Sequence, residues 1–243
     1  MSTDASSSRP VILRATARHR VGVRYDVPPE LLTSHLPDPL VPDTRTGEAA
    51  VELVGVHLRD VRVLGIAGPG LRHVPAVELR AAVRHPPTNR HGTITLQAYV
   101  PRRLVAWGAR TLYDEPVAVA SMQPLRRTSD DRVAMTYRFD WQGREQRLRV
   151  EGARTRGGGT SETDHPLTKS GGWRFATAGG GTLRCARLDQ DTEGVRRADT
   201  AHVTVRWRAA FGDIGALLAD RSPAGAWLGG EGPLALRWRE HIE

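Results

Sequence analysis

Short runs in which apolar and polar side chains alternate recur along this chain, and they set its fold class. In TITLQAYV, residues 93–100, the polar residues Thr95 and Gln97 face one side while apolar residues face the other. A period of two is that of a half-buried β-strand. Three further runs between residues 117 and 155 are expected to form consecutive antiparallel strands joined by hairpin-like connections. The pattern predicts about ten strands and two or three short helices, hence a mainly β antiparallel barrel or strongly curved sandwich.

Two helices and one long strand interrupt or extend this pattern. Residues 29–36 are expected to form a short helix that Pro37 ends. Residues 101–113 are expected to form a second helix whose Trp107 face packs against the barrel. Pro116 then forces a change of direction into a strand. The run at residues 48–66 alternates but changes face near Val54, which predicts a bulge or bend there.

The chain has 243 residues, enough for one large domain. We expect residues 1–10 to be a disordered, serine-rich lead-in and residues 11–243 to be a single domain. The first ten residues contain no apolar segment, so no secretory signal is expected. No run approaches the roughly 18–20 apolar residues that span a bilayer. These features favour a cytoplasmic protein that does not contact membranes.

The net charge of +8 does not by itself indicate nucleic-acid binding. Lys169 is the only lysine among 35 basic residues. The arginines are spread along the chain and often alternate with Val, Leu or Ala, as expected for the solvated faces of strands. No helix-turn-helix, zinc-finger or aromatic RNA-binding signature accompanies them. We therefore expect no specific nucleic-acid partner.

Common catalytic and cofactor motifs are missing. The sequence has no Gly-x-Ser-x-Gly, no phosphate-binding loop and no His-Glu-x-x-His. His85 and His91 lie six residues apart, but no further ligands are suggested by spacing, so no metal site is expected. Cys185, the single cysteine, is expected to be a small buried residue rather than a nucleophile. No cofactor is predicted.

Five segments in a fixed order nevertheless resemble a known group of proteins. They are YDVPPELLTSHLPDPL, VPAVELRAAVR, GTITLQAY, RLVAWGARTLYDEPVAVASM and LTKSGGWRF. Their order resembles the uncharacterised YqjF-like family, a domain-of-unknown-function group within the acetoacetate decarboxylase-like superfamily. The resemblance covers roughly residues 11–185. It implies a curved antiparallel β-barrel or cone around a central small-molecule cavity.

The same resemblance bears on the chemistry. In the decarboxylases of this superfamily, a helix with glycine, arginine and glutamate ends in a turn with proline and a lysine pair. One of those lysines forms a Schiff base with a β-keto acid. The matching residues here are Gly108-Ala109-Arg110, then Pro116, then Val117-Ala118. Valine and alanine have no nucleophile, so this position cannot supply amine catalysis.

Glu78 and Arg80 share one face of a predicted strand. Inside a barrel, Glu78 would have a raised pKa and could act as an acid or base. The alternative is an outward Glu–Arg pair on the sheet surface. Thr95, Gln97 and Tyr99 on the next strand could bind an oxygenated ligand, or they could meet water.

The remaining candidates lie on the second helix and the strand after it. Arg110 could bind a substrate carboxylate or lie in solvent, and Tyr113 could donate a hydrogen bond. Trp107 and Met122 are expected in the core or the cavity lining. Of the two faces of the following strand, we expect the one carrying Ala118, Ala120 and Met122 to point into the cavity.

These observations lead to three hypotheses. The first is a small-molecule enzyme that uses acid/base and pocket-shape catalysis for dehydration, cyclisation or isomerisation of an oxygenated or polyketide-like substrate. Glu78 would be its acid/base, Arg110 its anion clamp and Tyr113 a donor. The second is a non-catalytic barrel that binds a small ligand. The third keeps Schiff-base chemistry through Lys169, which can also be read as a surface residue. The sequence leaves a homo-oligomer open.

Overall fold

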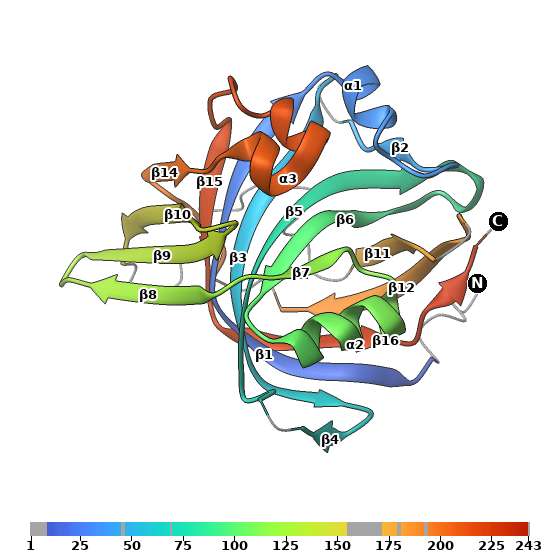
Figure 1. The fold of residues 1–243 in the computed structure, drawn as a ribbon, viewed down its shortest axis with the longest axis horizontal. Coiled ribbons are helices and arrows are strands. Elements are labelled where there is room, and N and C mark those ends of the chain that lie inside the picture. Colours follow the sequence, from blue (N-terminus) through green and yellow to red (C-terminus); the bar gives the residue numbers. More distant parts are fainter. Residues whose placement is uncertain are drawn as a thin grey trace.

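Seven strands close into a barrel, so the predicted mainly β barrel is confirmed (Figure 1). The computed structural model describes residues 9–44, 47–68, 70–154, 172–178, 181–191 and 194–242. Going around the ring, the strands are β1 (Val11–Val27), β3 (Ala49–Val63), β5 (His73–His85), β6 (Arg90–Val100), β11 (Gly172–Thr177), β12 (Leu183–Gln190) and β16 (Gly232–Arg237). β16 returns to β1, which closes the ring.

One pairing in this ring is parallel. Trp173–Phe175 of β11 run alongside Gly92–Ile94 of β6, whereas the other neighbours in the ring are antiparallel. Gly92 permits this pairing, because a Cβ there would lie 2.0 Å from the carbonyl oxygen of Trp173. This pairing joins two strands that are distant in the sequence. Thr95 of β6 and Arg174 of β11, for example, are 79 residues apart.

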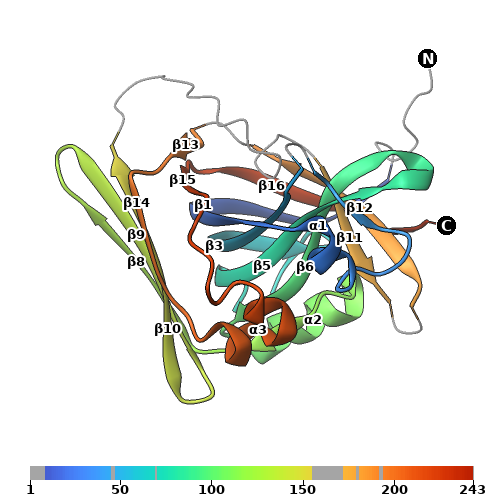
Figure 2. The same cartoon turned by 90° about the horizontal axis from the view of Figure 1, so that it is seen from above.

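A second, four-stranded sheet stands beside the barrel, as Figure 2 shows. Its strands are β8 (Met122–Thr128), β9 (Arg132–Trp141), β10 (Arg144–Ala153) and β14 (Thr200–Thr204). β8, β9 and β10 pair in succession, which confirms the predicted hairpins. Helix α3 (Trp207–Ala216) lies against the same region.

The main apolar core fills the space between this layer and the outer face of the barrel wall. Leu53, Val77 and Tyr99 of the barrel belong to it, together with Phe139 of β9 and Phe211 of α3. The ring of Tyr99 stacks on Phe139 with centroids 5.2 Å apart, and its hydroxyl donates to the carbonyl of Ala210. Burial of this many aromatic and branched side chains is the main source of stability.

β3 has the main core on its outer face and the barrel interior on its inner face. This arrangement corrects the expectation of a bulge or bend near Val54. β3 pairs with β5 without a register shift from Val51 to Arg59, so there is no bend at Val54. From Ala49 to Val56 all residues of β3 except Glu52 are apolar or glycine, because one set faces the outer core and the other faces the barrel interior. The register shifts occur in the pairing of β1 with β3. One extra residue lies in β1 between Arg18 and Val21, where His19 has a φ of 51°, and one lies in β3 between Arg59 and Arg62, where Asp60 has a φ of 51°.

Shorter elements complete the described chain. Helix α2 (Arg103–Tyr113) follows β6 and lies along the barrel (Figure 1). Helix α1 (Pro29–Thr33) is shorter than expected and ends before Leu36. The remaining elements are β2 (Val41–Pro42), β4 (Ile66–Ala67), a 3₁₀ turn (Pro86–Thr88), β7 (Val117–Val119), β13 (Arg196–Arg197), β15 (Gly225–Gly229) and β17 (Glu240–His241). None of the helices in the described ranges has the length and apolarity to cross a bilayer.

Candidate functional site

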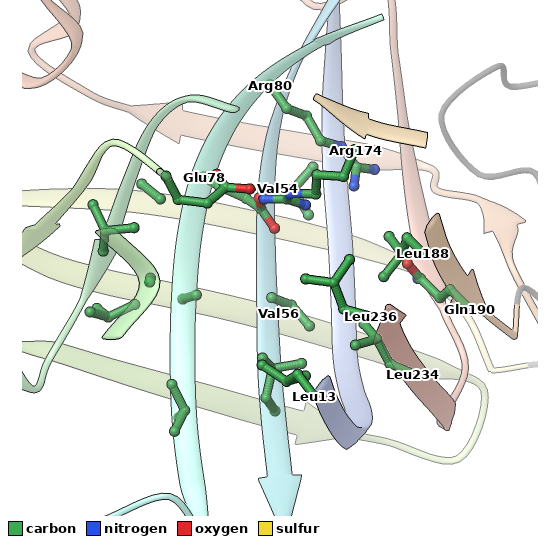
Figure 3. A pocket seen from close by; sticks show the side chains of 18 of the residues that line it. Leu13, Val54, Val56, Glu78, Arg80, Arg174, Leu188, Gln190, Leu234 and Leu236 are labelled. Carbon is green, nitrogen blue, oxygen red and sulfur yellow. Dashed lines mark hydrogen bonds and ion pairs between the residues drawn. The ribbon is translucent and has the colours of Figure 1, made fainter. Parts of the chain in front are cut away.

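The barrel encloses a cavity of about 200 Å³. All seven ring strands and helix α2 contribute to its wall. Its apolar lining consists of Leu13, Val54, Val56, Leu58, Val74, Ala76, Ala98, Val100, Val105, Ala109, Tyr113, Val117, Leu188, Val195, Trp227, Leu234 and Leu236, and its polar lining of Arg20, Glu78, Arg80, Glu115, Arg174 and Gln190. In Figure 3 the charged residues gather at one end, while Leu13 and Leu234 lie away from them.

Strand register explains how one wall of the cavity is built. Val54 pairs with Glu78, Glu78 with Ala98, and Ala98 with Val117. Directly opposed residues point to the same side of a sheet, so these four side chains form one row. Glu78 therefore faces the interior, and Val117 is the nearest residue of β7 in that row.

Arg174 organises the charged end. Its Nη2 donates to Glu78 Oε2 at 2.5 Å and to Thr95 Oγ1 at 2.6 Å. Its Nε donates to Glu115 Oε1 at 2.7 Å. A single buried guanidinium thus holds two carboxylates from β5 and from the turn after α2.

These contacts decide the protonation of Glu78. Burial alone raises the pKa of this carboxyl, but the charges of Arg174 and Arg80, with the hydrogen bond from Arg174, outweigh burial and lower it. Likewise, burial would lower the pKa of Arg174, but Glu115 and Glu78 raise it. The expectation of a raised pKa for Glu78 is therefore wrong. At neutral pH Glu78 is a carboxylate, which suits a base or a fixed charge and not a proton donor.

A second ion pair supports the first. Arg80 donates to the fully buried Glu52 from Nε at 3.2 Å and from Nη2 at 3.0 Å. Trp227 Nε1 donates to the other oxygen of Glu52 at 3.0 Å. The indole lies over Gly22, where an added Cβ would come within 2.3 Å of the ring. Gly22 is thus required for Trp227 to reach the cavity wall.

Three polar atoms on the cavity-lining side chains have no partner within the described protein. They are Nη2 of Arg20, Oε2 of Glu115 and the hydroxyl oxygen of Tyr113. All three side chains are at least nine-tenths buried. Arg20 is anchored by its other nitrogens, which donate to the carbonyls of Asp191 and Gly230 at 2.7 and 3.2 Å. Buried polar groups normally have partners, so these three atoms are the candidate contacts for a ligand.

The family follows from the sequence match. The family model DUF2071, described as an uncharacterized conserved protein, matches residues 14–209. This chain belongs to the DUF2071 family. The match confirms the resemblance to the uncharacterised YqjF-like group. No curated protein matches the sequence.

Solved structures similar to this DUF2071 protein share its fold. Acetoacetate decarboxylase from Legionella pneumophila has a TM-score of 0.69 and 14% identity, with 97% of this chain and 89% of that chain covered. An acetoacetate decarboxylase-like enzyme from Sphingomonas wittichii has a TM-score of 0.67 and 13% identity, covering 96% and 94%. The enduracididine biosynthesis enzyme MppR, complexed with pyruvate, has a TM-score of 0.63 and 13% identity, covering 97% and 91%. At these identities the likeness shows the fold alone.

Three of the residues predicted from the sequence line the cavity of the DUF2071 chain, namely Glu78, Arg80 and Tyr113. Thr95 lies beside them through its contact with Arg174. Its predicted neighbour Gln97 is on the opposite face. The reason is a bulge: Leu79 pairs with Gln97 and Arg80 with Thr95, which leaves the intervening residue of β6 unpaired and reverses the alternation.

Helix α2 places two predicted residues outside the cavity. Arg110 is exposed, and its Nε donates to the carbonyl of Val117 at 2.6 Å, so it is not an anion clamp in the cavity. Trp107 is 62% exposed, which corrects the expectation that its face packs on the barrel. The packed face carries Ala106, Ala109 and Tyr113. Small residues fit this close approach better than an indole.

The strand after α2 faces the opposite way from the expected one. Ala118, Ala120 and Met122 pack on the outer core, and Val117 lines the cavity. The expected strand over 117–124 is also two strands, β7 and β8, which belong to different sheets. Lys169 lies outside the described residues. Within the described part no group of His, Cys, Asp and Glu is placed to hold a metal.

Sequence reasoning missed Arg20, Glu115 and Arg174. Arg20 alternates with apolar residues in RVGVRYDV, as a surface arginine would. Glu115 lies in a turn beside Pro116, where no local pattern indicates burial. Arg174 is separated by 96 residues from Glu78 and by 59 from Glu115. The sequence offers only a partial signal: Trp173 and Phe175 share one face of β11 and pack on the outer core, so Arg174 between them must point to the other side of the wall.

Proposed function

We propose that this protein is a small-molecule enzyme that binds an oxo acid or a related oxygenated anion in the barrel and catalyses proton transfer next to its carbonyl group. Dehydration, isomerisation and cyclisation of a polyketide-like substrate all begin with such a step. One observation carries the proposal. Arg20 and Glu115 line the same cavity, and each has a polar atom, Nη2 of Arg20 and Oε2 of Glu115, without a partner among the described residues.

The gradient of polarity orients the substrate. The charged side chains Arg20, Glu78, Glu115 and Arg174 are buried or half-buried together at one end. Away from them the wall is aliphatic, and Leu13, Leu58 and Leu234 are partly exposed. The oxygenated group of a substrate therefore fits the charged end of the cavity, and its apolar part fits the aliphatic end. At about 200 Å³, the cavity is smaller than the roughly 300–1,000 Å³ of drug-sized sites.

Each residue then has one role. Arg20 donates through Nη2 to the carbonyl or carboxylate oxygen of the substrate and stabilises the negative charge that develops there. Glu115 Oε2 takes the proton from the adjacent carbon, and the electron pair moves onto the carbonyl oxygen. Returning the proton at another carbon isomerises the substrate, whereas loss of a β-hydroxyl with that proton releases water. Tyr113 stays protonated as a donor, since burial raises its pKa.

Arg174 acts differently from Arg20. Its donors are already directed at Glu78, Thr95 and Glu115, so it is a positioning residue. It keeps the Glu115 carboxylate oriented through Oε1 while Oε2 remains available. The role predicted for Glu78 is accordingly narrowed to a fixed negative charge or a base.

The chemistry proposed uses no Schiff base from β7. Val117 stands in the cavity row and carries no amine. The sequence resemblance aligns Val117-Ala118 with the lysine pair of the decarboxylases. MppR, of the same fold, is complexed with pyruvate, a 2-oxo acid. This supports a small oxo acid as the ligand class to test first.

The test is deuterium exchange into a panel of 2-oxo and 3-oxo acids in D₂O, followed by proton NMR. The native protein is expected to exchange the hydrogens next to the carbonyl of at least one acid. Glu115→Gln should slow exchange by about 10²-fold or more, as for loss of a general base. Arg20→Met should weaken binding and exchange together.

The control is Glu151→Gln, which removes a carboxylate on the four-stranded sheet and should leave exchange unchanged. Binding without exchange for every acid would replace the enzyme by a ligand-binding barrel. A borohydride-stable adduct on Lys169 would replace it by amine chemistry.

A further inference from the structure

Three histidines from neighbouring strands lie together on the outside of the barrel wall. His57 of β3 is central, with ring centroids 5.9 Å from His19 of β1 and 5.6 Å from His73 of β5. Val56 and Leu58 on either side of His57 line the cavity, so His57 points the opposite way. This group, with the arginines described next, is separate from the cavity site.

Three arginines add positive charge to the histidines. Arg18, Arg59 and Arg126 all lie close enough to His19 to lower its pKa. Among the described residues, Glu231 is the one carboxylate that counteracts them at His19, and none does so at His57. Glu231 is itself ion-paired with Arg18. We call the six basic residues the histidine cluster.

Several nitrogens in the histidine cluster are buried without a partner in the described protein. They are Nε of Arg18, Nε2 of His57 and Nε of Arg59. Each has lost water without gaining an acceptor, which is unfavourable. Like charges held close together are unfavourable as well. Both costs are relieved by a ligand that brings several oxygen acceptors and negative charge.

A metal ion does not fit this description. Imidazoles are good metal ligands, but three neighbouring guanidinium groups repel a cation. The three histidines also do not meet the geometry of a metal site in the described structure. Arginine forks instead match the oxygens of phosphate-type groups.

We propose that the histidine cluster is a binding site for a small doubly charged oxyanion, such as a phosphate group. The floor is formed by half-buried Arg18, His57 and Arg59, and the exposed His73 and Arg126 lie at its rim. The site opens on the outer face beside β8, so its ligand is distinct from that of the cavity.

Binding should be linked to protonation. Burial first, then neighbouring positive charges, lower the pKa of His19 and His57 below the ordinary 6.5. A bound anion opposes the second cause and raises both pKa values. In the pH range between the free and bound pKa values, binding takes up protons, so affinity increases as pH falls. The other charges facing these rings are Arg18, Arg59, Arg126, His73 and Glu231.

Sulfate is the probe, because it keeps its double charge across this range. Its binding is measured by titration calorimetry at pH 5.5 and 7.5, with proton NMR of the histidine C2 positions assigned through His57→Gln. Sulfate is expected to bind more tightly at the lower pH and to raise the pKa values of His19 and His57. Arg59→Gln should weaken binding by about tenfold, and the exposed Arg126→Gln, which cannot unfold the barrel, should weaken it several-fold.

Arg20→Met in the cavity should leave this binding unchanged, which separates the two sites. Equal sulfate affinity in Arg126→Gln and the native protein, or no change between the two pH values, would overturn the proposal. Tighter binding of Zn²⁺ than of sulfate at the same histidines would also overturn it, in favour of a metal site.

Discussion

The barrel wall carries charged groups on both faces, but in opposite states of balance. Inside, Arg174 and Arg80 each contact buried carboxylates at 2.5–3.2 Å. Outside, His57 has positive neighbours, and no carboxylate in the described part of the chain raises its pKa. Adjacent residues of β3 serve the two faces of the wall, because Val56 lines the cavity and His57 points outward. Paired opposite charges keep the inner groups in one protonation state over the neutral range. The excess of positive charge outside makes the protonation of the histidines depend on ligand and pH.

Removing Arg174 should break the inner balance with the largest effect. Arg174→Met leaves Glu78 and Glu115 buried without their shared cation, so the free energy of unfolding at pH 7 should fall by about 3–5 kcal/mol. Urea denaturation of this variant and of Arg149→Met provides the measurement. Arg149 pairs with Glu151 on an exposed sheet, and its loss should cost within about 1 kcal/mol.

The same variant has a defined pH dependence. Arg174 lowers the folded-state pKa of Glu78, so its contribution is present above the unfolded pKa and is lost as pH falls through the folded value. In Arg174→Met the lowering charge of Arg174 is gone and burial favours the neutral form of Glu78, so the variant is relieved as pH falls and the stability gap to the native protein should narrow from pH 7 toward pH 4. A gap that stays constant would show that the carboxylates are not the groups left uncompensated.

A glycine pair tests how the inner wall is packed. Gly22→Ala drives a Cβ to 2.3 Å from Trp227, whose indole binds Glu52, and should cost roughly 1–3 kcal/mol by overpacking. Gly108→Ala on α2 meets nothing within 4 Å and should stabilise by about 0.5–1 kcal/mol. Thermal melts of both variants suffice. Equal effects would mean that Trp227 does not lie over Gly22.

An alanine pair separates the two faces of the wall. Ala120→Leu enlarges a residue that is 3% exposed in the outer core, so it should cost roughly 1–3 kcal/mol and leave ligand binding unchanged. Ala98→Leu projects into the cavity and should reduce binding of an oxo acid with a smaller loss of stability. Weaker ligand binding in Ala120→Leu and unchanged binding in Ala98→Leu would contradict this assignment of the two faces.

The smallest effect is expected on α2. Trp107→Ala should change stability within about 0.5 kcal/mol, because the indole is 62% exposed. The same truncation in a packed helix face would cost roughly 3–5 kcal/mol. A denaturant midpoint distinguishes these values, and a large loss would restore the packing expected from the sequence.

Local patterns predicted most of the strands, the β8–β10 hairpins and the shared face of Glu78 and Arg80, but left open whether that face points into the barrel. They did not predict facts that depend on partners distant in the sequence. The bulge that turns Thr95 away from Gln97 is set by pairing with β5. The helix face was misassigned because Trp107 has more apolar surface than Ala106 or Ala109, although only small residues fit the contact. Arg174 reaches Glu78 only because β11 pairs with β6.

The closure of the ring by its first and last large strands has a consequence for synthesis. Val11 and Ala17 of β1 pair with Arg237 and Gly232 of β16. A ribosome that adds roughly 5–20 residues per second would leave that edge of β1 open for about 10–40 s before its partner emerges. Open strand edges invite aggregation. The nascent chain should therefore depend on chaperones during translation, and release of chains truncated before β16 should yield aggregates instead of a smaller barrel.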